Sequence, residues 1–265
     1  MVGTATRTLS DQLERLTSTA AAIWSARHML LSRMKSGEPE IFATVQGEGT
    51  SAGVPSVFVR LADCNLRCRW CDTKYTWDWS THDRAAETVE LAVSEIARRA
   101  LEVAGPGVRN AVFTGGEPLL QQDELVEVAT HLRGHGFTIE VETNGTVLPT
   151  EAFAASVDQW NVSPKLATSG NTDRARHRPA VLQWFAARQN AILKFVITSE
   201  DDVVEVRELT EALALPRERV LLSPEGVDAT TLAERSRWLA DRCRTYGYRL
   251  GTRLHVFLWG SERGR

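Results

Sequence analysis

The stretch Val57-Phe58-Val59-Arg60-Leu61-Ala62-Asp63-Cys64-Asn65-Leu66-Arg67-Cys68-Arg69-Trp70-Cys71 changes character at its middle. Its first five residues are β-branched, aromatic or aliphatic around a single arginine, which is typical of a buried strand. Three of the four cysteines in this chain of 265 residues then follow within eight positions. A disulfide framework usually has dispersed cysteines in a short secreted chain. The clustered thiols therefore predict a metal centre in a reducing compartment.

The spacing of these thiols favours an iron–sulfur cluster over zinc. Cys64, Cys68 and Cys71 follow a Cys-x3-Cys-x2-Cys pattern, and three thiolates on one loop can hold a cuboidal cluster while one iron keeps no protein ligand. A structural zinc site needs a fourth Cys or His, and His82 lies eleven residues beyond Cys71. Cys243 shares a predicted helical face with apolar residues, so it is interpreted as a buried hydrophobic residue.

Beyond the cysteines, predicted strands and helices alternate along the chain. This alternation indicates right-handed βαβ units around a parallel sheet, and about six units are too few for a closed eight-stranded barrel. We predict an α/β fold, a partial (β/α) barrel of about six parallel strands. The predicted strands are 57–61, 111–114, 137–142, 158–162, 191–197 and 220–222, with 253–259 closing the chain; the predicted helices are 87–103, 121–132, 151–156, 174–188, 202–213 and 232–246.

The first 36 residues differ from the rest of the chain. Apolar side chains recur at steps of three and four residues from Leu9 to Met34, which predicts an amphipathic helix. We therefore expect a helical extension over residues 1–36 and a catalytic domain over residues 37–265. The extension is interpreted as an accessory helix that covers one face of the domain, with a dimer contact or a loosely ordered leader as alternatives.

Composition excludes some classes of function. The chain has 31 Lys and Arg against 34 Asp and Glu, a net charge of −3. Proteins that bind nucleic acid without sequence preference usually carry a basic excess, and no apolar run approaches the roughly 20 residues of a membrane span. We expect a cytoplasmic protein with neither a nucleic-acid nor a membrane partner.

Polar and glycine-rich signatures follow the predicted strands. The carboxyl ends of parallel strands in a (β/α) barrel lie on one face, where active sites are built. We therefore expect these signatures to surround one site with the cysteines. They are Gly115-Gly116-Glu117-Pro118, Glu142-Thr143-Asn144-Gly145, Ser163-Pro164-Lys165 and Ser223-Pro224-Glu225-Gly226.

The cysteine motif with Trp70 inside it, together with Gly115-Gly116-Glu117-Pro118, resembles the radical S-adenosylmethionine (SAM) superfamily. Five further runs together resemble the 7-carboxy-7-deazaguanine synthase family, and that resemblance extends from about residue 38 to the end of the chain. They are Ala43-Thr44-Val45-Gln46-Gly47-Glu48-Gly49, Phe58 to Cys68, Cys71-Asp72-Thr73, Glu142-Thr143-Asn144-Gly145-Thr146, and Trp160-Asn161-Val162-Ser163-Pro164-Lys165.

The resemblance implies a reaction that turns 6-carboxy-5,6,7,8-tetrahydropterin into 7-carboxy-7-deazaguanine with loss of ammonia, as in queuosine-type biosynthesis. It also implies a 4Fe-4S cluster, SAM, Mg²⁺, an external flavodoxin- or ferredoxin-like electron donor, and a homodimer. The alternatives are a glycyl-radical-activating enzyme that acts on a protein backbone, and a cluster-bearing protein without enzymatic activity.

The resemblance further implies a role for individual residues. The implied cluster ligands are Cys64, Cys68 and Cys71, and the implied magnesium ligand is Thr73. The implied substrate contacts are Val45, Gln46, Gly47, Glu48, Arg60, Thr114 and His255. The implied SAM contacts are Trp70, Cys71, Asp72, Gly116, Glu117, Ser163, Pro164, Lys165, Ser223, Pro224, Glu225 and Gly226.

Alternative interpretations stay open for three residues, Glu142, Arg60 and His255. Glu140 and Glu142 share one strand face by the two-residue period, and we favour Glu142 as the catalytic carboxylate that exchanges a proton, with a polar rim position as the alternative. Arg60 could instead form a structural ion pair, and His255 could be a hydrogen-bonded core histidine.

Overall fold

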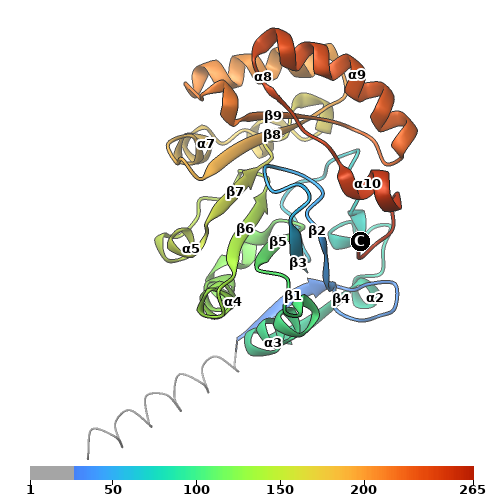
Figure 1. Ribbon diagram of the computed structural model, residues 1–265, viewed down its shortest axis with the longest axis vertical. Coiled ribbons are helices and arrows are strands. Elements are labelled where there is room, and N and C mark those ends of the chain that lie inside the picture. The colour runs from blue at the N-terminus through green and yellow to red at the C-terminus, as the bar shows by residue number, and fades with distance from the viewer. Residues whose placement is uncertain (1–26) are drawn as a thin grey trace, which may run out of the picture.

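A curved sheet with a parallel centre forms the frame of the protein. The computed structural model describes residues 27–265 (Figure 1). Seven parallel strands follow one another across the sheet, and the predicted partial barrel of about six parallel strands is confirmed, with a two-residue strand added at the edge. In spatial order they are β3 (Pro55–Leu61), β5 (Asn110–Gly115), β6 (Thr138–Thr143), β7 (Gln159–Val162), β8 (Ala191–Ile197), β9 (Val220–Pro224) and β10 (Arg249–Leu250).

Three antiparallel strands extend the other side of the sheet. β1 (His28–Ser32) lies between β3 and β4 (Thr88–Ala92), and β2 (Ile41–Val45) pairs with β3. The sheet therefore ends at β4 and β10 and does not close.

The helix predicted through Met34 is wrong over residues 28–32, because β1 is a strand there. Met29 and Leu31 are buried, at 1% and 0% exposure. Successive side chains of a strand point to opposite faces of the sheet, so residues two apart share the buried face. Residues 1–26, where the rest of that predicted helix falls, lie outside the described residues. Since β1 belongs to the same sheet as the cysteine-bearing strand, residue 36 is not a boundary of the folded unit.

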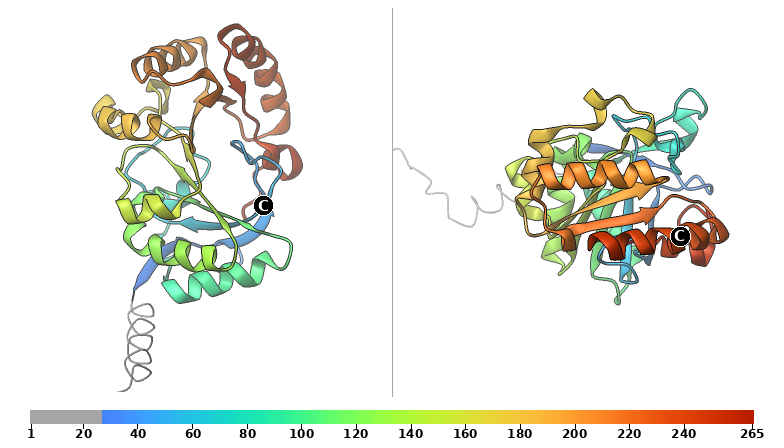
Figure 2. Two further views of the ribbon diagram at one scale, coloured as in Figure 1. Left: turned by 60° about the vertical axis from the view of Figure 1, so that its left-hand side comes forward. Right: turned by 90° about the horizontal axis from the view of Figure 1, so that it is seen from above.

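Most of the helices cover the outer face of the sheet (Figure 2). Most of them fall close to their predicted positions. They are α2 (Arg84–Glu87), α3 (Val93–Ala104), α4 (Gln122–Gly134), α5 (Glu151–Ser156), α6 (Asp173–Arg176), α7 (Pro179–Ala186), α8 (Glu200–Ala212), α9 (Ala229–Tyr246) and α10 (Leu254–Trp259), with 3₁₀ turns η1 (Lys74–Thr76), η2 (Pro118–Gln121), η3 (Ala167–Ser169) and η4 (Arg217–Arg219).

The sequence-based predictions for three further segments differ from the structure. Residues 88–92 form β4 instead of helix because they pair with β1. The helix predicted over 174–188 is divided ahead of Pro179, as expected because the residue before proline disfavours helical backbone. Residues 254–259 form α10 and not a strand. The chain leaves the sheet edge after Leu250 and crosses to β2, where the Leu254 amide donates to the Gly47 carbonyl at 2.9 Å.

The hydrophobic core lies between the sheet and these helices. α9 contributes Leu232, Leu239 and Cys243 to buried positions. Cys243 is a free thiol in the core, and burial raises its pKa to about 11, so it packs as the sequence predicts. No helix among residues 27–265 combines the length and apolarity that crossing a membrane requires.

Candidate active site

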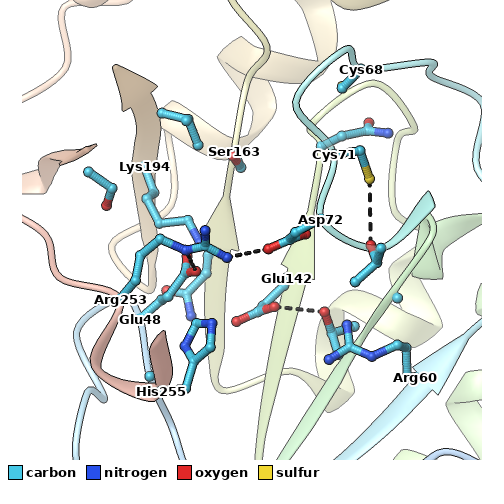
Figure 3. A pocket seen from close by; sticks show the side chains of 18 of the residues that line it. Glu48, Arg60, Cys68, Cys71, Asp72, Glu142, Ser163, Lys194, Arg253 and His255 are labelled. Atoms are coloured by element: carbon cyan, nitrogen blue, oxygen red, sulfur yellow. Dashed lines mark hydrogen bonds and ion pairs between the residues drawn. The ribbon is translucent and has the colours of Figure 1, made fainter. Parts of the chain in front are cut away.

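A cavity lies at the carboxyl ends of the parallel strands (Figure 3). The cavity and its opening enclose about 1380 Å³ of space that atoms do not fill. Its wall is built from the loop after β2, the cysteine loop after β3, the ends of β5 to β9, and α10. The predicted site residues that line it are Val45, Gln46, Gly47, Glu48, Arg60, Cys64, Cys68, Trp70, Cys71, Asp72, Thr73, Thr114, Gly116, Glu142, Ser163, Lys165, Ser223, Pro224, Glu225 and His255.

Three predicted residues do not line the cavity: Glu117, Pro164 and Gly226. Glu117 is fully buried, and its carboxylate accepts hydrogen bonds from the Leu119 and Asn144 amides and from the Thr143 hydroxyl, at 3.1, 2.7 and 2.7 Å. Burial raises the pKa of Glu117. Its side chain therefore joins the end of β5 to the end of β6 instead of facing a ligand.

The cysteine loop leaves β3 through strained backbone and is held against β5. Asp63 has a φ of 67°, which is uncommon outside glycine. A Cβ at Gly116 would overlap the carbonyl oxygen of Asp63, and the Gly116 amide donates to the Leu61 carbonyl at 2.9 Å. Glycine is needed here because the two backbones touch. The end of β5 and the start of the cysteine loop therefore form one rigid edge of the cavity.

The three thiols suit a cuboidal iron–sulfur cluster. All are free, and burial raises the pKa of Cys64 to about 12 and also raises that of Cys68. Among residues 27–265, no three His, Cys, Asp or Glu side chains converge on a position for a single metal ion. In a 4Fe-4S cluster each cysteine binds a different iron, so its ligands need not converge.

Two glutamates on β6 share one glutamine beside the cavity. Glu142 accepts hydrogen bonds from the Thr114 hydroxyl at 2.7 Å and from Gln46 Nε2 at 3.2 Å. Glu140 is fully buried and accepts Gln46 Nε2 at 2.7 Å, as well as the Asn110 and Asn161 side-chain amides. Burial and the neighbouring Glu142 raise the pKa of Glu140. The Gln46 side chain is therefore oriented by two carboxylates.

A chain of charges that the sequence analysis missed crosses the cavity. Glu48 pairs with Lys194 on β8 and with Arg253 Nε, the latter at 2.9 Å, while Arg253 also pairs with Asp72 (Figure 3). Burial alone would raise the pKa of Glu48, but the charges of Lys194 and Arg253 hold it below its usual range. A lysine inside an otherwise apolar strand was a signal for Lys194, whereas nothing local distinguishes Arg253.

Arg60 forms the structural ion pair that the sequence left open, and its side chain also lines the cavity. Its Nε donates to Glu40 Oε1 at 2.8 Å, and the Tyr75 hydroxyl donates to the same oxygen at 3.0 Å. The structural ion pair is therefore present. Within residues 27–265, the two terminal nitrogens of Arg60 have no hydrogen-bond partner, and the side chain lines the cavity (Figure 3). The guanidinium is held by one edge and leaves the other for a ligand.

His255 lies on α10 against the loop after β2. A Cβ at Gly47 would overlap His255 Nδ1, so the ring rests on glycine backbone. Burial lowers the pKa of His255, which favours the neutral imidazole at physiological pH. On the opposite side of the cavity, Lys165 Nζ donates to Ser163 Oγ at 2.8 Å and lies 5.5 Å from the Trp70 ring centroid.

Several buried polar atoms around the cavity lack a partner within the described part of the chain. They are Trp70 Nε1, Asn161 Oδ1 and Ser223 Oγ, and each belongs to a cavity-lining residue. Buried polar groups are normally hydrogen-bonded, so these atoms fit polar groups of a bound ligand. With the three thiols, they give the cavity the chemistry that a cluster, SAM and a polar heterocycle require.

Known proteins similar to this chain agree with the resemblance found in its sequence. A family model described as the radical SAM superfamily matches residues 59–168. The 7-carboxy-7-deazaguanine synthase of Pyrobaculum aerophilum is 41% identical over 227 residues, which is 85% of this chain and 96% of that protein. The synthase of Hyperthermus butylicus is 37% identical, over 83% of this chain and 91% of its own.

The fold also matches a solved structure. The crystal structure of QueE from Escherichia coli superimposes with a TM-score of 0.64 at 24% identity, covering 88% of this chain and 98% of that chain. At this level of identity the match bears on the fold.

Proposed function

Because the chain belongs to the 7-carboxy-7-deazaguanine synthase family, we propose that it converts 6-carboxy-5,6,7,8-tetrahydropterin to 7-carboxy-7-deazaguanine with loss of ammonia. The observation that carries this proposal is the cavity that joins three free thiols to Glu48, Arg60, Glu142 and His255. The comparisons give no support to a glycyl-radical-activating enzyme.

The thiols of Cys64, Cys68 and Cys71 are the residues that would hold the 4Fe-4S cluster. When bound, the cluster and SAM supply the one-electron chemistry that starts the rearrangement. We assign the polar groups of SAM to the side of the cavity formed by Trp70, Ser163 and Ser223. Trp70 and Ser223 carry buried polar atoms that have no partner among the described residues. Thr73 lines the cavity, and its hydroxyl, 3.6 Å from Cys71 Sγ, would offer one neutral oxygen to Mg²⁺.

The opposite side suits the carboxypterin. Within residues 27–265, the two terminal guanidinium nitrogens of Arg60 have no hydrogen-bond partner, and such a pair can bind a carboxylate in a bidentate manner. Glu48 is kept ionised by Lys194 and Arg253, so it can accept N–H groups of the pterin edge. Thr114, Gln46 and the neutral ring of His255 complete the polar wall around the heterocycle.

Glu142 is our choice for the residue that exchanges a proton with the substrate. It lines the cavity, and its orientation is set by hydrogen bonds from Thr114 and Gln46. A positioned general acid or base contributes about 10²- to 10⁴-fold to a rate.

We further propose the partners and surroundings that this chemistry needs. An external flavodoxin- or ferredoxin-like protein would deliver the electron, and an oxygen-sensitive cluster calls for the reducing cytoplasm. We expect a homodimer and contact only with the free small molecule, without a nucleic-acid or membrane partner.

The test is a turnover assay with the cluster-loaded protein under anaerobic, reducing conditions. The carboxypterin, SAM, Mg²⁺ and a chemical reductant are supplied, and the deazaguanine product is detected by mass spectrometry. The expected result is product that depends on SAM and on the cluster. Absence of product, while a synthase of the family works in parallel, would overturn the proposal. A Glu142→Gln variant should lose about 10²- to 10⁴-fold in turnover, whereas Glu151→Gln, at an exposed position of α5, should not.

A further inference from the structure

The cysteine sulfurs receive hydrogen bonds from side chains outside their own motif. The indole N–H of Trp77 donates to Cys71 Sγ, with 3.3 Å between nitrogen and sulfur. The amide Nδ2 of Asn171 donates to Cys68 Sγ, also at 3.3 Å. Cys64 Sγ accepts the Leu66 backbone amide at 3.4 Å. Two further side-chain contacts to the sulfurs are longer, because Thr73 Oγ1 lies 3.6 Å from Cys71 Sγ and Asn144 Nδ2 lies 3.9 Å from Cys64 Sγ.

Trp77 is held so that its N–H points at sulfur. The residue follows η1 and is only 7% exposed. The guanidinium of Arg67 lies 4.8 Å from the centroid of its ring, and Arg67 also donates to the Cys64 and Leu66 carbonyls. The indole is therefore clamped between the cysteine loop and a cation that the same loop fixes in place.

The orientation of Asn171 is also determined by its surroundings. Its Oδ1 accepts the Arg67 backbone amide at 2.7 Å. A backbone N–H requires an acceptor, so the oxygen of the side-chain amide must face it and the NH₂ group must face the other way. That NH₂ group reaches Cys68 Sγ and Ser169 Oγ. The donor to Cys68 is thus a consequence of how the loop after β7 meets the cysteine loop.

We propose, on the basis of the proposed function, that Trp77 and Asn171 raise the reduction potential of the cluster through these two N–H···S hydrogen bonds. A donor at a thiolate sulfur stabilises negative charge, and the reduced cluster carries one more negative charge than the oxidised cluster. Such a bond is stronger in a poorly solvated site than in water. Both residues are tuning residues that act through the cysteines.

The chain contains a matched control for Trp77. Trp79 lies two residues further on, and its indole N–H donates to Asp63 Oδ1 at 3.1 Å instead of to sulfur. Its ring is also covered by an arginine, Arg84, at 5.7 Å. Phenylalanine at either position keeps an aromatic ring and removes the N–H. The pair Trp77→Phe and Trp79→Phe therefore separates loss of an N–H···S bond from loss of an indole.

The experiment is a redox titration of the cluster-loaded protein, with the reduced cluster followed by electron paramagnetic resonance. We expect Trp77→Phe to move the midpoint potential to a more negative value and Trp79→Phe to leave it at the wild-type value. Asn171→Asp keeps the acceptor for the Arg67 amide, removes the donor to Cys68 and adds a negative charge. It should therefore also shift the potential to a more negative value.

An unchanged potential in Trp77→Phe, or equal shifts in the two tryptophan variants, would overturn the inference. If Trp77→Phe does not bind a cluster, the Asn171→Asp variant tests the inference instead. A midpoint potential of Asn171→Asp equal to that of the wild type would then overturn the inference. Failure of the wild type to bind a cluster would instead contradict the proposed function, so the two failures are distinguishable.

Discussion

Arg253 joins segments that lie far apart in the sequence. Its guanidinium contacts Glu48 after β2, Asp72 in the cysteine loop and the carbonyl of Gly226 after β9. Only 13% of its side chain is exposed. At the residue scale, this one side chain connects the proposed substrate side of the cavity with the proposed SAM side.

Replacement of Arg253 with methionine should weaken substrate binding. Hydrogen bonds to charged groups contribute about 1.5–3 kcal/mol, so loss of the pair with Glu48 should raise KM for the carboxypterin roughly 10- to 100-fold. Steady-state kinetics of the cluster-loaded enzyme measures this. Arg242→Met, which removes an exposed pair with Glu200 on the outer face, serves as the control. Equal KM values in the two variants would contradict the role given to Arg253.

Also at the residue scale, the raised pKa of Glu140 predicts that the stability of the fold depends on pH. Its native pKa is raised, mainly by burial and then by Glu142. A carboxyl group with a raised native pKa stabilises the fold below its unfolded pKa, about 4.3 for glutamate, and loses this contribution as pH rises through the native value.

The stability advantage of the wild type over Glu140→Gln should therefore be greatest in acid and shrink as pH increases. Urea unfolding of both cluster-loaded proteins, from about pH 4.5 to about pH 8, measures the difference in midpoint. A difference that grows with pH would show that Glu140 is stabilised as the anion by its amide donors.

At the scale of elements, the end of β5 and the start of the cysteine loop contact each other so closely that only glycine fits between them. Gly115 has a φ of 126°, and a Cβ at Gly116 would overlap the Asp63 carbonyl. Glu117 then connects this edge to the end of β6. The glycines therefore act by letting two backbones touch, and they place the cysteines beside the strand ends.

Gly116→Ala should disrupt this contact. The neighbour is backbone and cannot move aside as a side chain would, so we expect a loss of about 2–4 kcal/mol in stability, together with reduced iron content. Gly134→Ala is the matched control, because a Cβ there meets nothing within 4 Å. Thermal unfolding and iron analysis measure both effects. Normal iron content in Gly116→Ala would show that the cysteine loop can form without this contact.

At the scale of the whole molecule, the sheet defines where the folded unit starts. β1 lies between β3 and β4, and its register pairs all five residues from His28 to Ser32 with β4. Its removal would leave the Leu61 end of β3 without its partner Leu31 and would separate β4 from the sheet. The C-terminal segment contacts the same region, because Arg263 donates to the Arg33 carbonyl and to Glu87.

Two truncations test this boundary. A protein that starts at Arg27 keeps β1 and should retain the cluster and turnover, because every described site residue remains. A protein that starts at Gly37 lacks β1 and should be unfolded or aggregated, since unpaired strand edges associate. Circular dichroism and size-exclusion chromatography compare them. If both truncated proteins were folded and monodisperse, the folded unit would begin near residue 36, as the sequence suggested.

The sequence by itself determined the features that depend on neighbouring residues. The Cys-x3-Cys-x2-Cys spacing, the double glycine after a strand, and the alternation of strands with helices are local patterns. The cysteines and the double glycine follow β3 and β5 as predicted, and the alternation holds from β5 to α9. Because parallel strands bring their carboxyl ends to one edge, these local patterns were enough to gather most of the predicted residues around one cavity.

Only the tertiary structure decided the features that depend on distant partners. Residues 28–32 are a strand because β3 and β4 offer edges, and residues 254–259 are a helix because the chain has left the sheet. Glu117 turns inward because β6 supplies its donors. Lys194 and Arg253 enter the site through Glu48, which lies 146 and 205 residues away. Side-chain direction and long-range pairing are set by packing, which no local pattern in the sequence contains.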